Sequence, residues 1–393
     1  MIISKKPNFT QNFPSKRQFP WYICEIYSRP TNTRSLAVTE KFSPSPDPSP
    51  SPAKLRLEKF ALQSAARKLL PDSRTAKCLR LRQAYQDGVD VFRSLEHKTT
   101  SYGGLQTCGS VWACPVCANK ISERRRLEVS DAISQHETAG GEVLLLTLTN
   151  PHTRNDDLHD MTKAQAKAMS RFTGCRAVRS IFSDIGFIGS IRAWEVTHGQ
   201  ANGWHPHFHI LLFVNFGVDR EALEEKLYTQ WAKACDKSGL AAPSRVHGVK
   251  VDNGSKAAKY VSKWGLDYEV TKGHIKKATK IGGRSPFDLL RSYLYDEDKQ
   301  AGALFFTFSK VYKGKRQLYW SKGLKEHFSV KDITDEETAA KQDDRAELMG
   351  KIELDEWKII LKFELRGEIL ELARHGWEPV RRLLDSLFIC TDG

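Results

Sequence analysis

The chain has 393 residues, and 61 lysines and arginines outnumber 47 aspartates and glutamates to give a formal charge of +14. A hydrophobic content of 40% supports a real core and excludes a wholly disordered protein, while the length predicts two or three domains. From Lys331 onward, 10 basic and 16 acidic residues give −6, so residues 1–330 carry +20. This imbalance predicts a polyanionic partner, above all nucleic acid.

The N-terminal leader is taken as residues 1–73, and residues 43–52 read SPSPDPSPSP, which predicts an extended linker. The opening MIISKKPNFTQNF lacks the apolar centre of a secretory signal, and no apolar run is long enough to span a membrane. Three of the eight cysteines crowd into residues 108–117, with the rest scattered. That distribution favours a reducing, cytoplasmic location over a disulfide framework.

Strands and helices alternate after a cysteine-bearing segment, residues 74–128. The predicted elements are strands at Glu142–Thr149, Phe187–Thr197 and Pro206–Val214, and helices at Asp157–Phe182, Val218–Lys237 and Ser255–Trp264, with Asp156 or Asp157 and Asp219 as N-caps. This order predicts an α+β fold over residues 129–330, a compact sheet with helices on one side. Residues 331–393 read as acidic amphipathic helices. The absence of GxGxxG and Walker motifs argues against an ATP-driven enzyme.

Two histidines on the third predicted strand indicate a cation site. His207 and His209 are two residues apart, so both imidazoles project from one face, while Phe208 and Ile210 face a core. Glu195, on the preceding strand, supplies the third ligand that this pattern needs. Two imidazoles and a carboxylate suit Mg²⁺ or Mn²⁺ acting on a phosphate.

Other interpretations of this strand stay open. His205 is a further candidate ligand, although Pro206 interrupts the ladder beside it. A cupin-like or non-haem iron site also uses a His-x-His pair, but its acid follows the pair within a few residues, where this chain has Ile210–Phe213. The simplest alternative is a pair of surface histidines beside an apolar strand.

A tyrosine in the helix at 255–264 is the candidate nucleophile. Lys256 and Lys263 share the helical face of Tyr260, and positive charge beside a phenol favours its ionised form and attracts a phosphate. The alternative for this segment is a half-buried tyrosine on a basic helix that touches DNA.

Cys108, Cys114 and Cys117 have a spacing, with a Cys-Pro-Val-Cys knuckle, that predicts a structural Zn²⁺ site. Cys78 is the first candidate for the fourth ligand and His97 the second. Unmatched free thiols are the alternative.

Together these motifs resemble the plasmid rolling-circle replication initiators of the HUH endonuclease superfamily, single-tyrosine type. The segments that carry the resemblance are Thr107–Cys117, Leu144–Thr149, Trp204–Leu212, Ala258–Lys263 and Gly314–Ser321, in that order. The resemblance implies a sheet-centred, ferredoxin-like nuclease that nicks one strand of a plasmid origin and rejoins it. Glu195, His207 and His209 would hold the cation, Tyr260 would attack with Lys263 beside it, and host helicase and polymerase would follow.

Basic segments are the candidate DNA contacts. The residues expected to touch DNA are Thr147, Thr149, Lys256, Lys259, Lys313, Lys315 and Arg316, and Lys310–Trp320 interleaves charge with aromatic rings suited to single-stranded DNA. Some relatives carry a glutamate four residues before the tyrosine, where this chain has Lys256. Termination then falls to another acid (Asp267 or Glu269), to Tyr268, or to a second subunit of a homodimer.

Two other functions compete with this one. A transposase or relaxase would share the fold, but this chain lacks a three-histidine relaxase cluster and carries the cysteine block before its first motif. A zinc-containing regulator that binds DNA without catalysis is the alternative from a different class. A metalloenzyme of small molecules would leave the charge of +20 on residues 1–330 unexplained.

Overall fold

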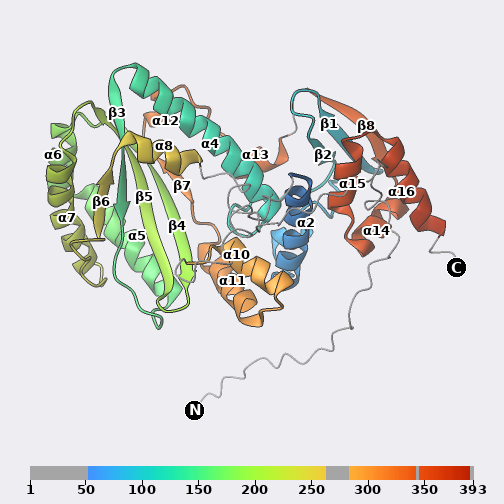
Figure 1. Ribbon diagram of the computed structural model, residues 1–393, viewed down its shortest axis with the longest axis horizontal. Helices are drawn as coiled ribbons and strands as arrows, with labels where there is room; N and C mark the ends of the chain where they lie inside the picture. The colour runs from blue at the N-terminus through green and yellow to red at the C-terminus, as the bar shows by residue number, and fades with distance from the viewer. Residues whose placement is uncertain (1–51, 263–282, 342–344, 390–393) are drawn as a thin grey trace, which may run out of the picture. The chain divides into compact units, whose positions relative to one another are not determined.

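A computed structural model describes residues 52–262, 283–341 and 345–389 (Figure 1). Its larger sheet is antiparallel throughout, in the order β6-β3-β5-β4-β7. The strands are β3 (Gly141–Leu148), β4 (Gly189–Gly199), β5 (Gly203–Asn215), β6 (Val249–Asp252) and β7 (Leu318–Trp320). The three predicted strands coincide with β3, β4 and β5 to within a few residues, and the predicted α+β fold with a central antiparallel sheet is confirmed.

The tight connection between β4 and β5 sets the register of the sheet. Gly199 pairs with Gly203, and counting back from that pair places Glu195 opposite His207. Gly203 has φ +72°, and a Cβ there would lie 2.9 Å from the Cα of Arg154. Only glycine meets both demands without strain, so the residue that closes the hairpin also lets the 150–154 loop approach it.

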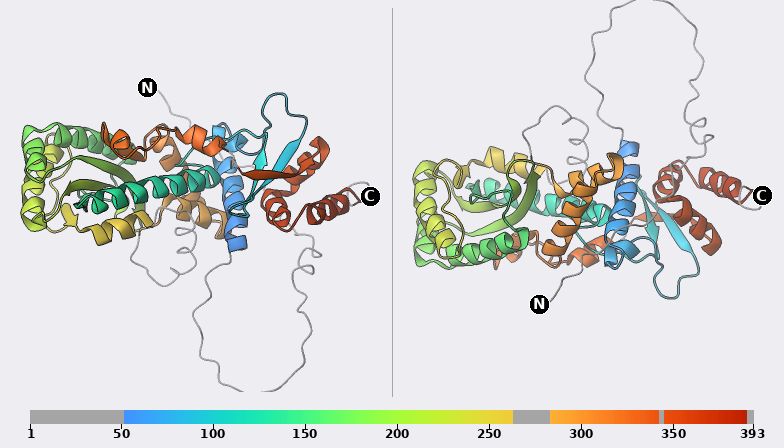
Figure 2. Two further views of the ribbon diagram at one scale, coloured as in Figure 1. Left: turned by 90° about the horizontal axis from the view of Figure 1, so that it is seen from above. Right: turned by 90° about the horizontal axis from the view of Figure 1, so that it is seen from below.

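Helices cover both faces of this sheet (Figure 2). One face, including Leu144 and Phe208, packs against α5 (Leu158–Gly174), α7 (Arg220–Asp236), α10 (Pro286–Tyr295) and α11 (Lys299–Tyr312). The other, including Leu145 and Phe213, packs against α4 (Pro115–Thr138), α8 (Gly254–Ser262) and α12 (Leu324–His327). The expectation of helices on one side was therefore wrong. Residues 210–214 are apolar at every position, so both faces of β5 need cover.

One predicted helix is divided in two. Instead of a single helix over residues 157–182, α5 ends at Gly174 and α6 (Arg176–Asp184) follows Cys175, whose ψ of 132° is extended. Glycine is a poor helix former, which explains the break beside it. Of the two N-cap candidates for α5, Asp157 is the cap, because its side chain accepts from the Asp160 amide. The predicted cap of α7 is confirmed, because Asp219 accepts from the Ala222 amide.

A second, smaller sheet joins distant parts of the chain. It has the order β2-β1-β8, from β1 (Val89–Ser94), β2 (Thr100–Gly103) and β8 (Ala346–Ile352). It packs with α14 (Leu354–Phe363), α15 (Arg366–Ala373) and α16 (Glu378–Ile389), which confirms the helical C-terminal region. The strand β8 and the short helix α13 (Asp335–Ala340) were not foreseen there.

Residues 52–69, assigned to the leader by sequence, form a helix in the core. The helix is α2 (Pro52–Leu69), and α3 (Arg74–Lys77) follows it. Leu62 and Ala66 are fully buried, and α2 packs against α4, α10 and α15. Likewise, α4 runs without interruption through residues 128 and 129, where a domain boundary was drawn from the sequence.

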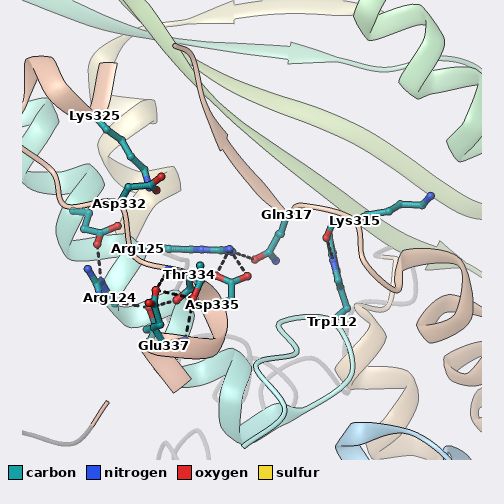
Figure 3. A network of polar contacts seen from close by, with 12 residues as sticks. Trp112, Arg124, Arg125, Lys315, Gln317, Lys325, Asp332, Thr334, Asp335 and Glu337 are labelled. Carbon is teal, nitrogen blue, oxygen red and sulfur yellow. Dashed lines mark hydrogen bonds and ion pairs between the residues drawn. The ribbon is translucent and has the colours of Figure 1, made fainter. Parts of the chain in front are cut away.

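Polar contacts fasten α13 and the edge of the larger sheet to α4 (Figure 3). The guanidinium of Arg125 donates to both carboxylate oxygens of Asp335, at 2.7 and 2.8 Å, and to Oε1 of Gln317 at 2.9 Å. The Gln317 carbonyl accepts from the amide of Trp194 in β4. Arg124 and Arg126 pair with Glu128 and Glu123, so the basic run of α4 is neutralised within the chain.

Replacing Arg125 with methionine should lower the free energy of unfolding by about 1–3 kcal/mol, because Asp335 and Gln317 are deprived of a partly buried charged partner. Arg126→Met, one residue along, removes only an exposed pair on the same helix and should cost no more than about 0.5 kcal/mol. Urea denaturation of both variants measures the difference. Equal destabilisation of the two variants would show that Arg125 does not fasten these elements.

Candidate active site

Glu195, His207 and His209 converge at one end of the larger sheet. Their ligand atoms lie within 4.8 Å of one another. Nε2 of His207 is 3.5 Å and Nε2 of His209 is 3.7 Å from Oε2 of Glu195. These separations fit three ligands around a single divalent cation, and Glu195 keeps 36% of its side chain exposed, which leaves the site open to a further ligand.

Hydrogen bonds orient both imidazoles. Nδ1 of His209 lies 2.9 Å from Oγ1 of Thr147 on β3, and Nδ1 of His207 lies 3.2 Å from the carbonyl oxygen of His205. If Nδ1 carries the proton in each ring, Nε2 is free to bind a metal. Thr147 was expected to contact DNA, whereas its hydroxyl faces a candidate metal ligand.

The Tyr260 side chain lies directly over this site. Its hydroxyl donates to Oε1 of Glu195 at 2.5 Å, and its ring centroid is 4.6 Å from that of His209. Ala257 and Val261, four residues apart on α8, are buried against the sheet and fix the orientation of the helix. Lys256 instead pairs with Asp252 at 2.5 Å, and 64% of its side chain is exposed.

The electrostatics of Glu195 favour its charged form. Burial alone would raise its pKa, but hydrogen bonding to His207, the nearby imidazoles of His207 and His209, and the Tyr260 hydroxyl lower the pKa to about 2. The carboxylate is therefore available to a cation at neutral pH.

A buried amide supports the histidine-bearing strand β5 from its other face, and no sequence pattern pointed to it. Gln165 of α5 is fully buried and donates to the carbonyl of Pro206 at 2.7 Å and to Oδ1 of Asn150 at 2.6 Å. Its Oε1 accepts from Nε1 of Trp194. Proline is tolerated at position 206 although it has no N–H to donate. Its nitrogen and carbonyl point to the side of β5 on which β3 pairs, and that pairing ends at Phe208, so no hydrogen bond of the sheet is lost.

His205 extends the row of histidines without joining the three-ligand group. Its Nδ1 lies 3.3 Å from Nδ1 of His152, and the rings are 4.7 Å apart. Burial and the neighbouring imidazoles lower the pKa of His205 to about 4, so it is neutral at physiological pH.

The four cysteines Cys78, Cys108, Cys114 and Cys117 form a buried cluster. The sulfur of Cys117 lies 3.5 Å from that of Cys78 and 3.7 Å from that of Cys108, and the Cys78–Cys114 distance is 3.8 Å. A tetrahedral Zn²⁺ with bonds of about 2.3 Å has sulfurs about 3.8 Å apart, so the cluster fits the metal. The second candidate, His97, is excluded from the cluster, because 66% of its side chain is exposed beside Glu96.

The surroundings of the cluster act differently on its thiols. Hydrogen bonds from Cys108 and the other two cysteines lower the pKa of Cys117, whereas a hydrogen bond with Cys108 raises the pKa of Cys78 and burial raises that of Cys114. The Ser110 amide lies 3.5 Å from the sulfur of Cys108, and α4 begins at Pro115 and directs its N-terminus to the cluster. Of the remaining cysteines among the described residues, Cys235 is buried and Cys175 half-buried.

The basic turn between α11 and β7 flanks the part of β4 that carries Glu195. Lys313 and Arg316 are exposed, Lys315 is half-buried, and Gly314 has φ +76°. The Lys315 carbonyl accepts from Nε1 of Trp112, in the cysteine segment, at 2.7 Å (Figure 3). The Lys315 side chain points away from that contact (Figure 3).

The other predicted contact residues are dispersed. Thr149 donates to the His247 carbonyl, and Lys259 is exposed on α8. Lys263, Asp267, Tyr268, Glu269 and most of the basic segment Lys272–Arg284 lie outside the described residues. Within the described part, no helix is long and apolar enough to cross a membrane.

Comparisons with known proteins identify the family. Residues 104–368 match the family model described as Replication protein, Rep_1. Protein rep of Streptomyces lividans is 26% identical over 355 residues, covering 72% of this chain and 74% of that protein. Protein rep of Staphylococcus aureus is 30% identical over 106 residues, 26% of this chain and 43% of that protein.

A protein of Streptomyces cyanogenus named Neomycin resistance protein is 30% identical over 176 residues, 36% of this chain and 40% of that protein. No solved structure matches the chain. Because the family model spans more than half of the residues and includes both the cysteine cluster's knuckle and the Glu195–Tyr260 site, the chain belongs to the Rep_1 family of replication proteins.

Proposed function

We propose that this replication protein initiates rolling-circle replication of a plasmid by nicking one strand at the origin through Tyr260 and later rejoining it. The observation that carries the proposal is the hydrogen bond from the Tyr260 hydroxyl to Glu195, a member of the three-ligand group. A nucleophile held against a cation-binding carboxylate is an arrangement for phosphoryl transfer.

In the reaction, the Tyr260 oxygen bonds to phosphorus and the bond from phosphorus to the 3′-oxygen breaks. The phenol gives up its proton, the 3′-oxygen gains one, and the 5′-phosphate remains on the tyrosine. The phosphodiester energy is conserved in the new bond, so rejoining needs no ATP. The free 3′-hydroxyl serves a host polymerase, and a host helicase would open the duplex ahead of it.

Glu195, His207 and His209 would hold Mg²⁺ or Mn²⁺, which when bound stabilises negative charge on the scissile phosphate. Glu195 orients the tyrosine rather than deprotonating it. Its pKa is held below the usual range of a carboxyl group, so Glu195 is a weak base toward a phenol. The phenol proton would be released to solvent, from which the 3′-oxygen takes one.

The cysteine cluster would hold a structural Zn²⁺, with no part in the chemistry. Its contribution is to the fold, because Trp112 from the same segment donates to Lys315 and packs its ring 4.6 Å from that of Tyr312. Tyr312 in turn lies 5.5 Å from Trp194, the neighbour of Glu195.

Single-stranded DNA would lie along the end of the sheet that carries Glu195. Lys313, Lys315 and Arg316 would supply phosphate contacts there. Membership of the Rep_1 family supports this function over the transposase and relaxase alternatives. At termination, the second subunit of a homodimer would supply the second nucleophile.

Tyr260→Phe and His207→Ala should abolish a covalent adduct while leaving DNA binding intact. Single-stranded oligonucleotides tiling the replicon are incubated with each protein and Mn²⁺ or chelator, and adducts are separated on a denaturing gel. A band that needs metal, His207 and Tyr260 supports nicking. Binding without any adduct, in the wild type as well, would favour the non-catalytic zinc regulator.

Thr147→Val should raise the Mn²⁺ concentration needed for half-maximal adduct formation about 10–100-fold, because His209 is left without its orienting partner. Thr149→Val is the matched control, since that hydroxyl donates to the carbonyl of His247, away from the three-ligand group. DNA affinity in chelator should be unchanged in both variants. A fall in affinity confined to Thr147→Val would assign this residue to DNA contact instead.

Lys313→Gln with Arg316→Gln should weaken binding and flatten its salt dependence. The slope of log affinity against log salt should fall by about 0.7 for each phosphate that the protein no longer neutralises. Lys358→Gln with Arg382→Gln removes the same charge from exposed positions of the acidic C-terminal region and is the control. Fluorescence anisotropy at several salt concentrations measures both. Identical slopes in the two double variants would move the DNA path away from this turn.

A further inference from the structure

Arg366, the first residue of α15, carries a guanidinium that is completely buried. It donates to Oε1 of Gln63 at 2.5 Å, to Oγ of Ser64 at 3.0 Å and to the Leu79 carbonyl at 3.2 Å. A charge removed from water to this degree needs an opposite charge close by.

The carboxylates near Arg366 do not balance the local positive charge. Glu364 lies 3.5 Å from Arg366, but its same oxygen makes a closer contact with a second buried guanidinium, that of Arg80. Glu368 is the other acid nearby, and burial raises its pKa, which disfavours its charged form. Two cations therefore share one well-placed carboxylate.

Gln63 connects this surplus charge to the cysteine cluster. A guanidinium only donates, so the amide oxygen of Gln63 must face Arg366 and the amide nitrogen must face away. That nitrogen lies 3.4 Å from the sulfur of Cys114. The sulfur is therefore the acceptor, and the amide of Gln63 is oriented with its oxygen toward the guanidinium and its N–H toward the sulfur.

We infer that Arg366, acting through Gln63, is the counter-charge of the metal–thiolate centre, and that the attachment of the C-terminal helices to α2 depends on the metal. A divalent ion with four thiolates has a net charge of −2, which supplies the missing negative charge. The inference rests on the zinc site proposed above. Because Arg366 acts through Gln63, it is a positioning residue. Its carbonyl also accepts from the Tyr102 hydroxyl, which joins β2 of the small sheet to the first residue of α15.

The test compares Arg366→Met with Arg56→Met in the full-length protein. Arg56 of α2 also reaches α15, through two hydrogen bonds to Glu371, which lead away from the cysteines. Metal content is measured first, then zinc affinity by competition with a chromogenic chelator, and then the sulfur-to-metal charge-transfer spectrum of the Co²⁺ form.

Arg366→Met should lower zinc affinity about 10–100-fold and shift the Co²⁺ spectrum, whereas Arg56→Met should change neither. Equal zinc affinity in wild type and Arg366→Met, or an equal reduction in Arg56→Met, would overturn the inference. A wild type that purifies without zinc, and does not take it up, would instead refute the metal site itself.

Hydrogen exchange on the wild type gives a second reading that does not depend on the folding of any variant. Removing zinc with a chelator should increase amide exchange in α15 and in the facing turns of α2. The interior of β5 serves as the internal control and should stay protected. Exchange in α15 that is unaffected by zinc removal would overturn the proposed dependence.

Discussion

The antiparallel pairing of β4 with β5 is the constraint on which the site depends. Because side chains alternate in a strand, a shift of one residue would turn Glu195 away from His207 and His209 and send it into the core. The Gly199–Gly203 pair fixes this register at the hairpin. The packing of apolar residues on both faces of β5 fixes it along the rest of the strand. The ligands therefore come into place as a consequence of folding the sheet.

Local sequence patterns predicted much of this arrangement. The alternation His207–Phe208–His209 requires the two imidazoles to share a face, and the short connection from Glu195 requires an antiparallel neighbour, so the three-ligand group followed from spacing alone. Tyr260 was found because lysines surround it in the sequence, yet Lys256, one of the two predicted to share its helical face, pairs with Asp252 instead. The packing of Ala257 and Val261, which a single segment cannot reveal, is what orients the tyrosine.

Contacts between distant parts of the chain account for what could not be predicted. Gln165 reads as an ordinary polar residue of an amphipathic helix, although it is buried and bonded to Asn150 and Pro206. Residues 52–69 directly follow a proline-rich run, and for that reason the sequence placed them in the leader. In the structure they form the helix α2, against which α4, α10 and α15 pack. The partners of Gln165 lie 15 and 41 residues away, and Gln63 of α2 lies 303 residues from its partner Arg366, so none of these contacts can be read from a local pattern.

The small sheet has a consequence for folding during synthesis. Strand β1 is made early and β8 is among the last elements to be synthesised, yet the two pair along their length. On the ribosome, the larger sheet can close once β7 has emerged, while one edge of β1 waits unpaired and α2 lacks its partner α15. A chain that stops before β8 would thus possess Glu195, His207, His209 and Tyr260 without the strand that pairs with β1 and without the helix α15 that packs on α2.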